Sequence, residues 1–186
     1  MVILYVVLGV VALVGLSVVV MYNRFVRQRV LIDSSWGGID VELTRRHDLI
    51  PNLVSTVQGY ATHEREVLTA LTAAREQATA HQSDAPAARQ QFEEQVGQTL
   101  GTVLARAEAY PELKASANFL DLQHQLTDTE NRIAAARRFY NLNVGAYNTR
   151  VRTFPSNVVA GMFSFGLRDI FEVSDVTVRQ NPEVSL

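Results

Sequence analysis

Among neighbouring residues in this sequence, His63 and Glu64 most resemble part of a catalytic metal site. In zinc metallopeptidases, one helix carries two histidines four residues apart, so that both face one metal ion, and the glutamate after the first histidine acts as the general base. Val67 stands in the place of the second histidine, and the other histidines are scattered along the chain. We therefore expect a structural or solvated role for His63, and no bound metal.

Other catalytic classes have equally little support in the residue types. The chain contains no cysteine, which excludes a disulfide framework, a thiolate nucleophile and cysteine-ligated metals. Its serines stand in no G-x-S-x-G context, and the sequence has no glycine-rich phosphate loop. The formal net charge of −2 gives no basic field to attract a nucleic acid. We predict a protein that is not an enzyme, needs no cofactor and does not bind nucleic acid.

Arg45, Arg46, Asp48 and Asn52 form a group of charged and amide side chains around Pro51, where we expect a helix to break. A carboxylate here can accept helix-start amide hydrogens or pair with a guanidinium group, so a helix cap and a surface ion pair are the simplest interpretation. The alternative is a structural polar network that joins this break to the last long helix and fixes the register between them. The candidate residues of this network are Arg45, Asp48, Asn52, Glu130, Arg137 and Asn141.

Residues 1–22 indicate where in the cell this chain is located, because they contain no ionisable side chain other than two tyrosines. At about 1.5 Å per residue, a helix of this length covers roughly 33 Å, close to the hydrocarbon thickness of a bilayer. A cleaved signal peptide would need a basic start and a shorter apolar stretch. Arg24, Arg27 and Arg29 follow the span, which predicts a single-pass anchor with the remainder on the cytoplasmic side of the inner membrane.

Residues 23–165 read as helices separated by short breaks, with few alternating patterns typical of strands. We expect a first helix that leaves the membrane and breaks near residues 48–51, a second to about residue 80, and a third over 86–110. Gly37 and Gly38 predict a bend or a close helix contact. Ser83 or Asp84 is the expected cap of the third helix.

The fourth predicted helix has the clearest pattern, because large apolar residues recur every seven positions, as in the core of a helical bundle. The recurring residues are Phe119, Leu126, Ile133, Tyr140, Tyr147 and Phe154. A short apolar helix is expected over 158–165, and residues 166–186 form an irregular tail. The predicted fold is therefore all-α, with an N-terminal transmembrane helix that continues into an elongated antiparallel four-helix-type bundle.

The sequence resembles the LemA family of bacterial membrane-anchored proteins in four stretches and in its apolar start. The stretches are WGGIDVELTRRHDLIPNLVSTVQGYATHE (36–64), AEAYPELKASANFLDLQ (107–123), TENRIAAARRFYNLNVGAYN (129–148) and FPSNVVAGMFSF (154–165). The resemblance implies one N-terminal transmembrane helix, a helical bundle and no established enzymatic activity. It also implies membrane partners, such as a membrane metallopeptidase, because the family is associated with magnetosome membranes and with neighbouring genes for such peptidases.

The combination of an anchor, long periodic helices and no recognisable chemistry favours a scaffold or adaptor that acts through protein–protein contacts. Self-association is expected because Trp36 and other apolar residues follow the span, where one thin bundle does not cover them. The expected partners are the lipid bilayer, further copies of the chain and other membrane proteins. Two alternatives stay open, a membrane-associated hydrolase using His63, Glu64 or Glu66, and a small-ligand sensor with a cavity between helices.

Overall fold

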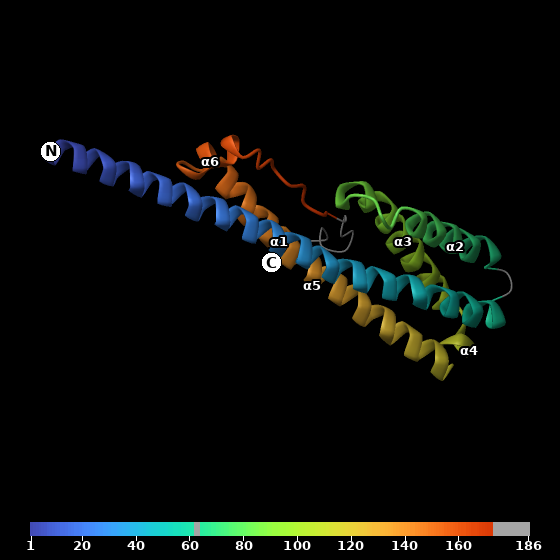
Figure 1. Ribbon diagram of the computed structural model, residues 1–186. Coiled ribbons are helices and arrows are strands. Elements are labelled where there is room, and N and C mark those ends of the chain that lie inside the picture. Colours follow the sequence, from blue (N-terminus) through green and yellow to red (C-terminus); the bar gives the residue numbers. More distant parts are fainter. Residues whose placement is uncertain (62–63, 173–186) are drawn as a thin grey trace, which may run out of the picture. The chain divides into compact units, whose positions relative to one another are not determined.

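The structure is a computed structural model that describes residues 1–61 and 64–172. All regular elements in these residues are helices, which confirms the all-α prediction (Figure 1). They are α1 (Val2–Tyr60), α2 (Arg65–Ala80), α3 (Pro86–Ala107), α4 (Pro111–Lys114), α5 (Ala117–Arg152) and α6 (Ser156–Met162). The chain divides into two compact units. The first contains residues 1–39 and 136–170, and the second contains residues 40–135 together with the described residues 171–172.

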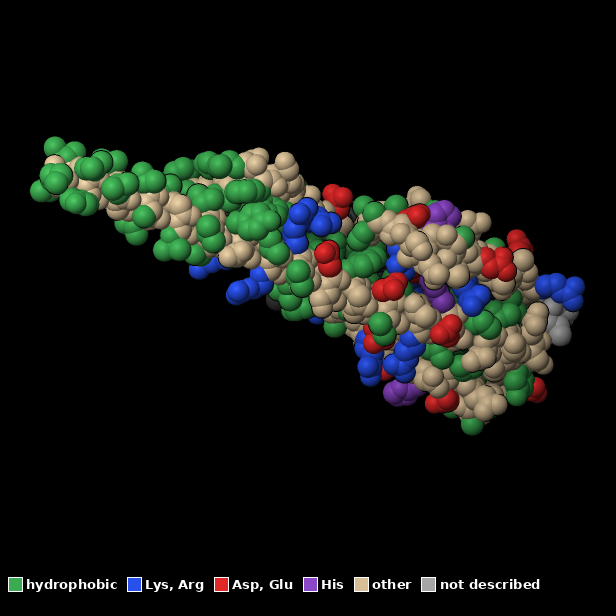
Figure 2. All heavy atoms as spheres, viewed as in Figure 1, with side chains coloured by type: hydrophobic (Ala, Val, Ile, Leu, Met, Phe, Trp, Pro, Cys, Tyr) green, Lys and Arg blue, Asp and Glu red, His purple; other side chains and the backbone are tan. Residues whose placement is uncertain are grey.

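Helix α1 begins with the longest apolar stretch of the chain. An 18-residue window in it has a mean hydropathy of 2.9 with none of its side chains buried, so α1 contains one candidate membrane span by length and composition. Figure 2 shows hydrophobic side chains covering this end, with the first basic side chains only further along. An uncovered apolar surface of this size is unfavourable in water. The long apolar N-terminal helix predicted from the sequence is thus present.

Helix α1 runs through Pro51 without the predicted break, so the expectation of a new helix there was wrong. Proline removes only one backbone donor from the helix, and Ile50 and Leu53 beside it are buried in the bundle core. That burial holds the backbone helical, and the helix ends at Tyr60 instead. Gly37 and Gly38 also lie within α1, and the open space around both excludes a close helix contact, one of the two alternatives predicted there.

The second unit is a helical bundle with one apolar core. Its segments are residues 40–60 of α1, then α2, α3, α4 and residues 117–135 of α5. Helices α2 and α3 lie side by side and antiparallel, joined by the turn at 81–85 (Figure 1). Every segment supplies buried residues to the core, which include Leu53, Val57, Leu71, Val96, Leu100, Leu113, Phe119 and Leu126. This is the helical bundle that the periodic spacing predicted.

The first unit is held together by aromatic side chains from α1, α5 and the segment that follows α6. The ring of Phe25 stacks on Phe165 at 4.7 Å between centroids and meets Tyr147 edge to face at 5.8 Å. Further along α1, Trp36 meets Tyr140 edge to face at 5.5 Å. Such ring pairs add about 0.5–1.5 kcal/mol beyond the area that they bury. They fix α5 and the segment after α6 against α1 within this unit.

Two local predictions from the sequence are wrong, and a third cannot be compared over most of its length. Phe154, the last of the seven-residue repeat, is 77% exposed because α5 ends at Arg152, two residues before it. Helix α3 starts after Ala85 with no side-chain cap, and Pro86 at its first position has no N–H to satisfy. Neither Ser83 nor Asp84 is therefore the cap. Most of the predicted tail, residues 173–186, lies outside the described residues.

Candidate functional site

Glu93 is the centre of a buried group of charged side chains in the bundle unit. It comes from α3 and lies on the same helix face as Val96 and Leu100, so the packing that buries those residues also buries its carboxylate. Arg46 Nη2 donates to Glu93 Oε2 at 2.7 Å, and His47 Nε2 lies 3.1 Å from the same oxygen. Glu93 is only 1% exposed. A buried carboxylate is stable only when it is paired in this way.

The charges around Glu93 outweigh the cost of burying it. Burial alone raises the pKa of a carboxyl group, because it disfavours the charged form. Here the hydrogen bond with His47 and the positive charge of Arg46 act in the opposite direction, and together they lower the pKa of Glu93 from 4.5 to about 2. The group is therefore an ionised acceptor at neutral pH. It is unsuited to donate a proton in catalysis.

The two arginines of the group connect it to the other parts of the bundle. Arg46 also donates to the backbone oxygen of Glu93 at 3.1 Å and to Glu130 Oε1 on α5 at 3.1 Å. Arg89 lies 3.4 Å from Glu93 Oε1 and donates to Asp40 on α1 at 2.7 Å. Since each guanidinium group contacts two or more segments, the group fixes how α1, α3 and α5 pack in this unit.

One further contact brings α2 into the same arrangement. Arg75 Nε on α2 donates to the backbone oxygen of His47 at 2.7 Å, although that oxygen lies within α1. Arg89 also donates to the oxygen of Gln82 at 2.8 Å, in the turn between α2 and α3. We name the five residues Arg46, His47, Arg89, Glu93 and Glu130 the charge cluster. Its contacts tie together the four long helical segments of the bundle unit.

The network predicted from the sequence overlaps with the charge cluster only at Glu130. Arg45 points outward and lies 4.0 Å from Asp128, with both side chains more than 40% exposed. Asp48 and Asn52 are exposed on α1. Arg137 and Asn141 are half-buried and belong to the other unit, where each has interactions of its own. The complete predicted network therefore stays a prediction.

His47, Arg89 and Glu93 were not chosen from the sequence, and Arg46 was noted only in the group around Pro51, although one signal was available. Glu93 belongs to the spacing 93, 96, 100, 103 and 107, which alternates steps of three and four along the buried face of α3. A glutamate in such a position needs buried cations. Arg89, four residues earlier on the same face, is the one nearest to it in the sequence.

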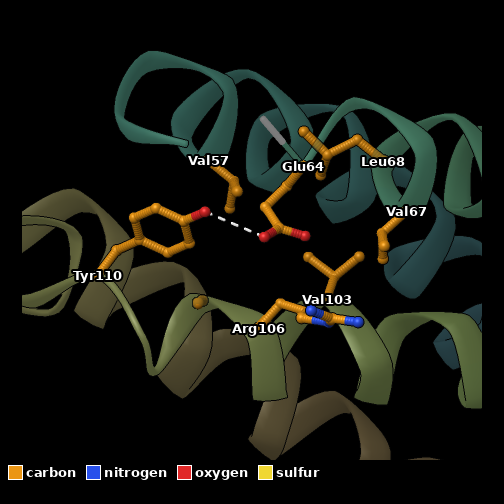
Figure 3. A pocket seen from close by; sticks show the side chains of 8 residues that line it. Val57, Glu64, Val67, Leu68, Val103, Arg106 and Tyr110 are labelled. Atoms are coloured by element: carbon orange, nitrogen blue, oxygen red, sulfur yellow. Dashed lines mark hydrogen bonds between the residues drawn. The ribbon is translucent and has the colours of Figure 1, made fainter. Parts of the chain in front are cut away.

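A second polar contact closes the end of the bundle between α2 and α3. The Tyr110 hydroxyl donates to Glu64 Oε1 at 3.0 Å, and Val57 and Val103 line the same place (Figure 3). The hydrogen bond to Glu64, partial burial and the negative charge nearby raise the pKa of Tyr110. The space is too small to admit a water molecule, so it does not hold the ligand that a sensor would bind.

The residues named for a hydrolase do not form a site in the described part of the chain. Glu64 is bound to Tyr110, as above, and Glu66 is exposed in the first turn of α2. His63 lies outside the described residues. The hydrolase interpretation therefore gains nothing from the described geometry.

Taken with the apolar start of α1, the all-α bundle and its charge cluster define a helical-bundle protein with a candidate N-terminal membrane span. The LemA family model matches residues 35–186, and the chain belongs to that family. This confirms the resemblance noted from the sequence.

The chain is similar to a protein named LemA and to magnetosome proteins named MamQ. It is 25% identical over 154 residues to Protein LemA of Metamycoplasma hominis, which covers 83% of this chain and 70% of that protein. It is 24% identical over 190 residues to Magnetosome protein MamQ 2 of Paramagnetospirillum magneticum, and the alignment covers 89% of this chain and 70% of that protein. Magnetosome protein MamQ of Magnetospirillum gryphiswaldense is 23% identical over 168 residues, and the alignment covers 77% of this chain and 62% of that protein. None of these names states an enzymatic activity.

Proposed function

We propose that the chain is a membrane-anchored scaffold or adaptor that acts through protein–protein contacts and self-association, with the bundle unit on the cytoplasmic side of the inner membrane. The observation that carries this proposal is an apolar stripe on the outside of α5 in the first unit. Phe139 is 53% exposed and Leu142 is 71% exposed, and Ala146 is also exposed. Steps of three and four residues place these side chains on one helix face, which we name the outer stripe.

The position of the outer stripe along the first unit argues against lipid as its cover. Tyr140, beside Phe139, contacts Trp36, which lies 14 positions beyond Tyr22 on α1. At about 1.5 Å per residue, that distance along the helix is roughly 21 Å beyond the end of the span. Exposed apolar side chains in water at this level are typical of a protein contact.

The contact surface that we propose differs from the one expected from the sequence. Trp36 was the residue expected to drive self-association, but its ring is half-buried against Tyr140. The outer stripe therefore replaces it as the proposed contact. Because a membrane confines copies of the chain to two dimensions, a small surface of this kind suffices for association. The two relatives named magnetosome proteins agree with a role at a membrane.

The test uses the absence of cysteine, because one introduced thiol is then the only one in the chain. Leu142→Cys in the full chain, in native membranes under mild oxidation, should give a disulfide-linked dimer. Asn131→Cys, an exposed polar position on the same helix, is the matched control and should give much less. A thiol crosslinker that joined position 142 to another membrane protein would support the adaptor role instead. No adduct at position 142, together with a monomeric mass in detergent, would contradict the proposal.

The cytoplasmic side is tested separately with a membrane-impermeant maleimide. Thr127→Cys lies exposed on α5 in the bundle unit. We expect it to stay unlabelled in intact cells or spheroplasts and to react after the membrane is opened. Labelling in intact spheroplasts would place the bundle on the opposite side. This orientation rests on the basic residues that follow the span.

A further inference from the structure

A second apolar surface lies in the first unit, at α6 and the residues on either side of it. Residues 153–167 contain no Asp, Glu, Lys, Arg or His. Within this segment, Val159, Ala160 and Phe165 are buried, so they hold the segment to the rest of its unit. We name residues 154–167 the hook. Its outward side chains are Phe154 at 77%, Val158 at 52%, Met162 at 67%, Phe163 at 45% and Leu167 at 51% exposure.

Ring contacts fix the hook at the end of the apolar span. Phe163 meets Tyr22 edge to face at 4.9 Å, and Phe165 lies 5.6 Å from the same ring. Phe165 also stacks on Phe25, three residues further along α1. Tyr22 is the last aromatic residue before Arg24, so it marks the level at which the uncharged stretch ends. The hook is therefore beside α1 at this level, within the first unit (Figure 1).

The charges around the hook follow the pattern of a segment at a membrane surface. Arg152 precedes it and Arg168 follows it, while Arg24 and Arg27 are exposed on α1 just beyond Tyr22. An apolar surface bordered by arginines suits the boundary between acyl chains and headgroups, where the cations meet lipid phosphates. Figure 2 shows hydrophobic side chains on the visible face of this part of the molecule.

We propose that the outer face of the hook inserts into the interfacial layer of the same membrane that the span crosses, so that each chain holds the bilayer at two places. The occupant of this face is lipid, because the face lies beside Tyr22, at the level where the span leaves the membrane. The outer stripe of α5 lies further from that level and is left for protein contacts. This inference rests on the span lying in lipid, as proposed above.

This arrangement would restrict the tilt and rotation of the first unit relative to the bilayer. A single span leaves a protein free to tilt and turn about one axis, whereas a second contact point beside it fixes both. Helix α5 packs on α1 and leads directly into α6, so the hook also fixes α5 near the membrane. The surface that carries the outer stripe would then be presented in one orientation to neighbouring copies.

The experiment places an environment-sensitive fluorophore on single cysteines in the full chain, reconstituted in phospholipid vesicles. Met162→Cys and Val158→Cys report on the hook, Val11→Cys marks the middle of the span, and Thr127→Cys is the exposed control. Quenching is measured with iodide in water and with lipids that carry a nitroxide near the headgroup. At position 162 we expect strong quenching by the lipid nitroxide, and iodide quenching at least about threefold below that at position 127.

A charged variant provides the matched test. Met162→Asp changes an exposed side chain, so the helical content should be retained, which circular dichroism would check. A label at Val158→Cys in this background should lose most of its lipid quenching, because an aspartate on the same face disfavours insertion. Unchanged lipid quenching at position 158 in the charged variant would overturn the inference.

The remaining outcomes separate this inference from the proposed anchor. If Val11→Cys is shielded from iodide but Met162→Cys is as accessible as Thr127→Cys, the span is in lipid and the hook inference is wrong. If Val11→Cys is itself accessible to iodide, the anchor fails, and the hook inference falls with it. If the shielding at position 162 disappears at about one chain per vesicle, the hook face binds another copy, and the inference is overturned.

Discussion

Arg46 Nη2 and Glu93 Oε2 lie 2.7 Å apart, and both side chains are almost completely buried in the core of the bundle unit. The two residues belong to different helices, α1 and α3, so the pair fixes one helix against the other. Each is also the closest oppositely charged partner of the other. An unpaired buried charge is among the most costly defects that a single substitution can create.

Replacing Glu93 with glutamine should destabilise the bundle unit strongly. Glu93→Gln keeps the size of the side chain but leaves Arg46 without its closest anion, and breaking a buried pair from one side typically costs about 3–5 kcal/mol. The free energy of unfolding is measured by urea denaturation of the full chain in detergent micelles, followed by circular dichroism. Glu94→Gln, at the adjacent and less buried position, is the matched control and should change it by no more than about 0.5 kcal/mol. Equal effects of the two variants would contradict a structural role for the pair.

The stability of the bundle unit should depend on acid in a defined range of pH. The pKa of Glu93 in the folded chain is lowered from 4.5 to about 2, so the unfolded chain binds a proton at a higher pH than the folded chain. The contribution of ionised Glu93 to the free energy of unfolding is therefore complete above about pH 4.5 and is lost as the pH falls toward 2. This contribution is about 3 kcal/mol. Denaturation at several pH values should show this loss, and Glu93→Gln should lack that part of the slope. A variant with the same slope as the original chain would contradict the assignment.

Arginine is required at position 46 because its planar group donates to three acceptors at once. Arg46→Lys keeps the positive charge but cannot reach the Glu93 side chain, the Glu93 backbone oxygen and Glu130 together. We expect a loss of about 2 kcal/mol in the free energy of unfolding. Arg45→Lys, one position away and exposed beside Asp128, should change it by less than about 0.5 kcal/mol. A larger effect at position 45 than at position 46 would favour the network expected from the sequence.

The two tyrosines of the seven-residue repeat in the first unit should respond differently to the loss of their hydroxyl groups. The Tyr140 hydroxyl donates to the Asp169 backbone oxygen at 3.1 Å, so Tyr140→Phe should destabilise by about 1 kcal/mol. The Tyr147 hydroxyl is buried without a hydrogen-bond partner among the described residues, so Tyr147→Phe should be neutral or slightly stabilising. Thermal unfolding of the full chain in micelles compares the two variants. The reverse order would show that the surroundings of the two rings are wrongly assigned.

The parts of the fold that the sequence predicted are those set by long repeated patterns. Residues 1–22 contain no Asp, Glu, Lys, Arg or His, and the structure has an uncovered apolar helix there. The seven-residue repeat placed Phe119, Leu126 and Ile133 in the interior, and all three are buried. In such segments many side chains support the same conclusion, so no single residue decides it.

The parts that the sequence did not predict depend on single residues and on packing between distant segments. Pro51 was read as a break, but the burial of its neighbours outweighs the lost hydrogen bond. Adjacent helical residues point about 100° apart, so local sequence could not decide whether Arg45 or Arg46 faces the core. The partner that decides it is Glu93, 47 positions away on α3. Only the packed structure brings those two residues together.

We propose that residues 1–22 lie in lipid and that the bundle unit packs in water. The most direct measurement is alkaline carbonate extraction of membranes from cells that express the full chain. We expect the chain to stay in the membrane pellet, and Val11→Arg combined with Val14→Arg to release a large part of it, because two charges in the middle of a span oppose insertion. Recovery of the intact, unprocessed chain in the soluble fraction would show that residues 1–22 do not anchor it in lipid.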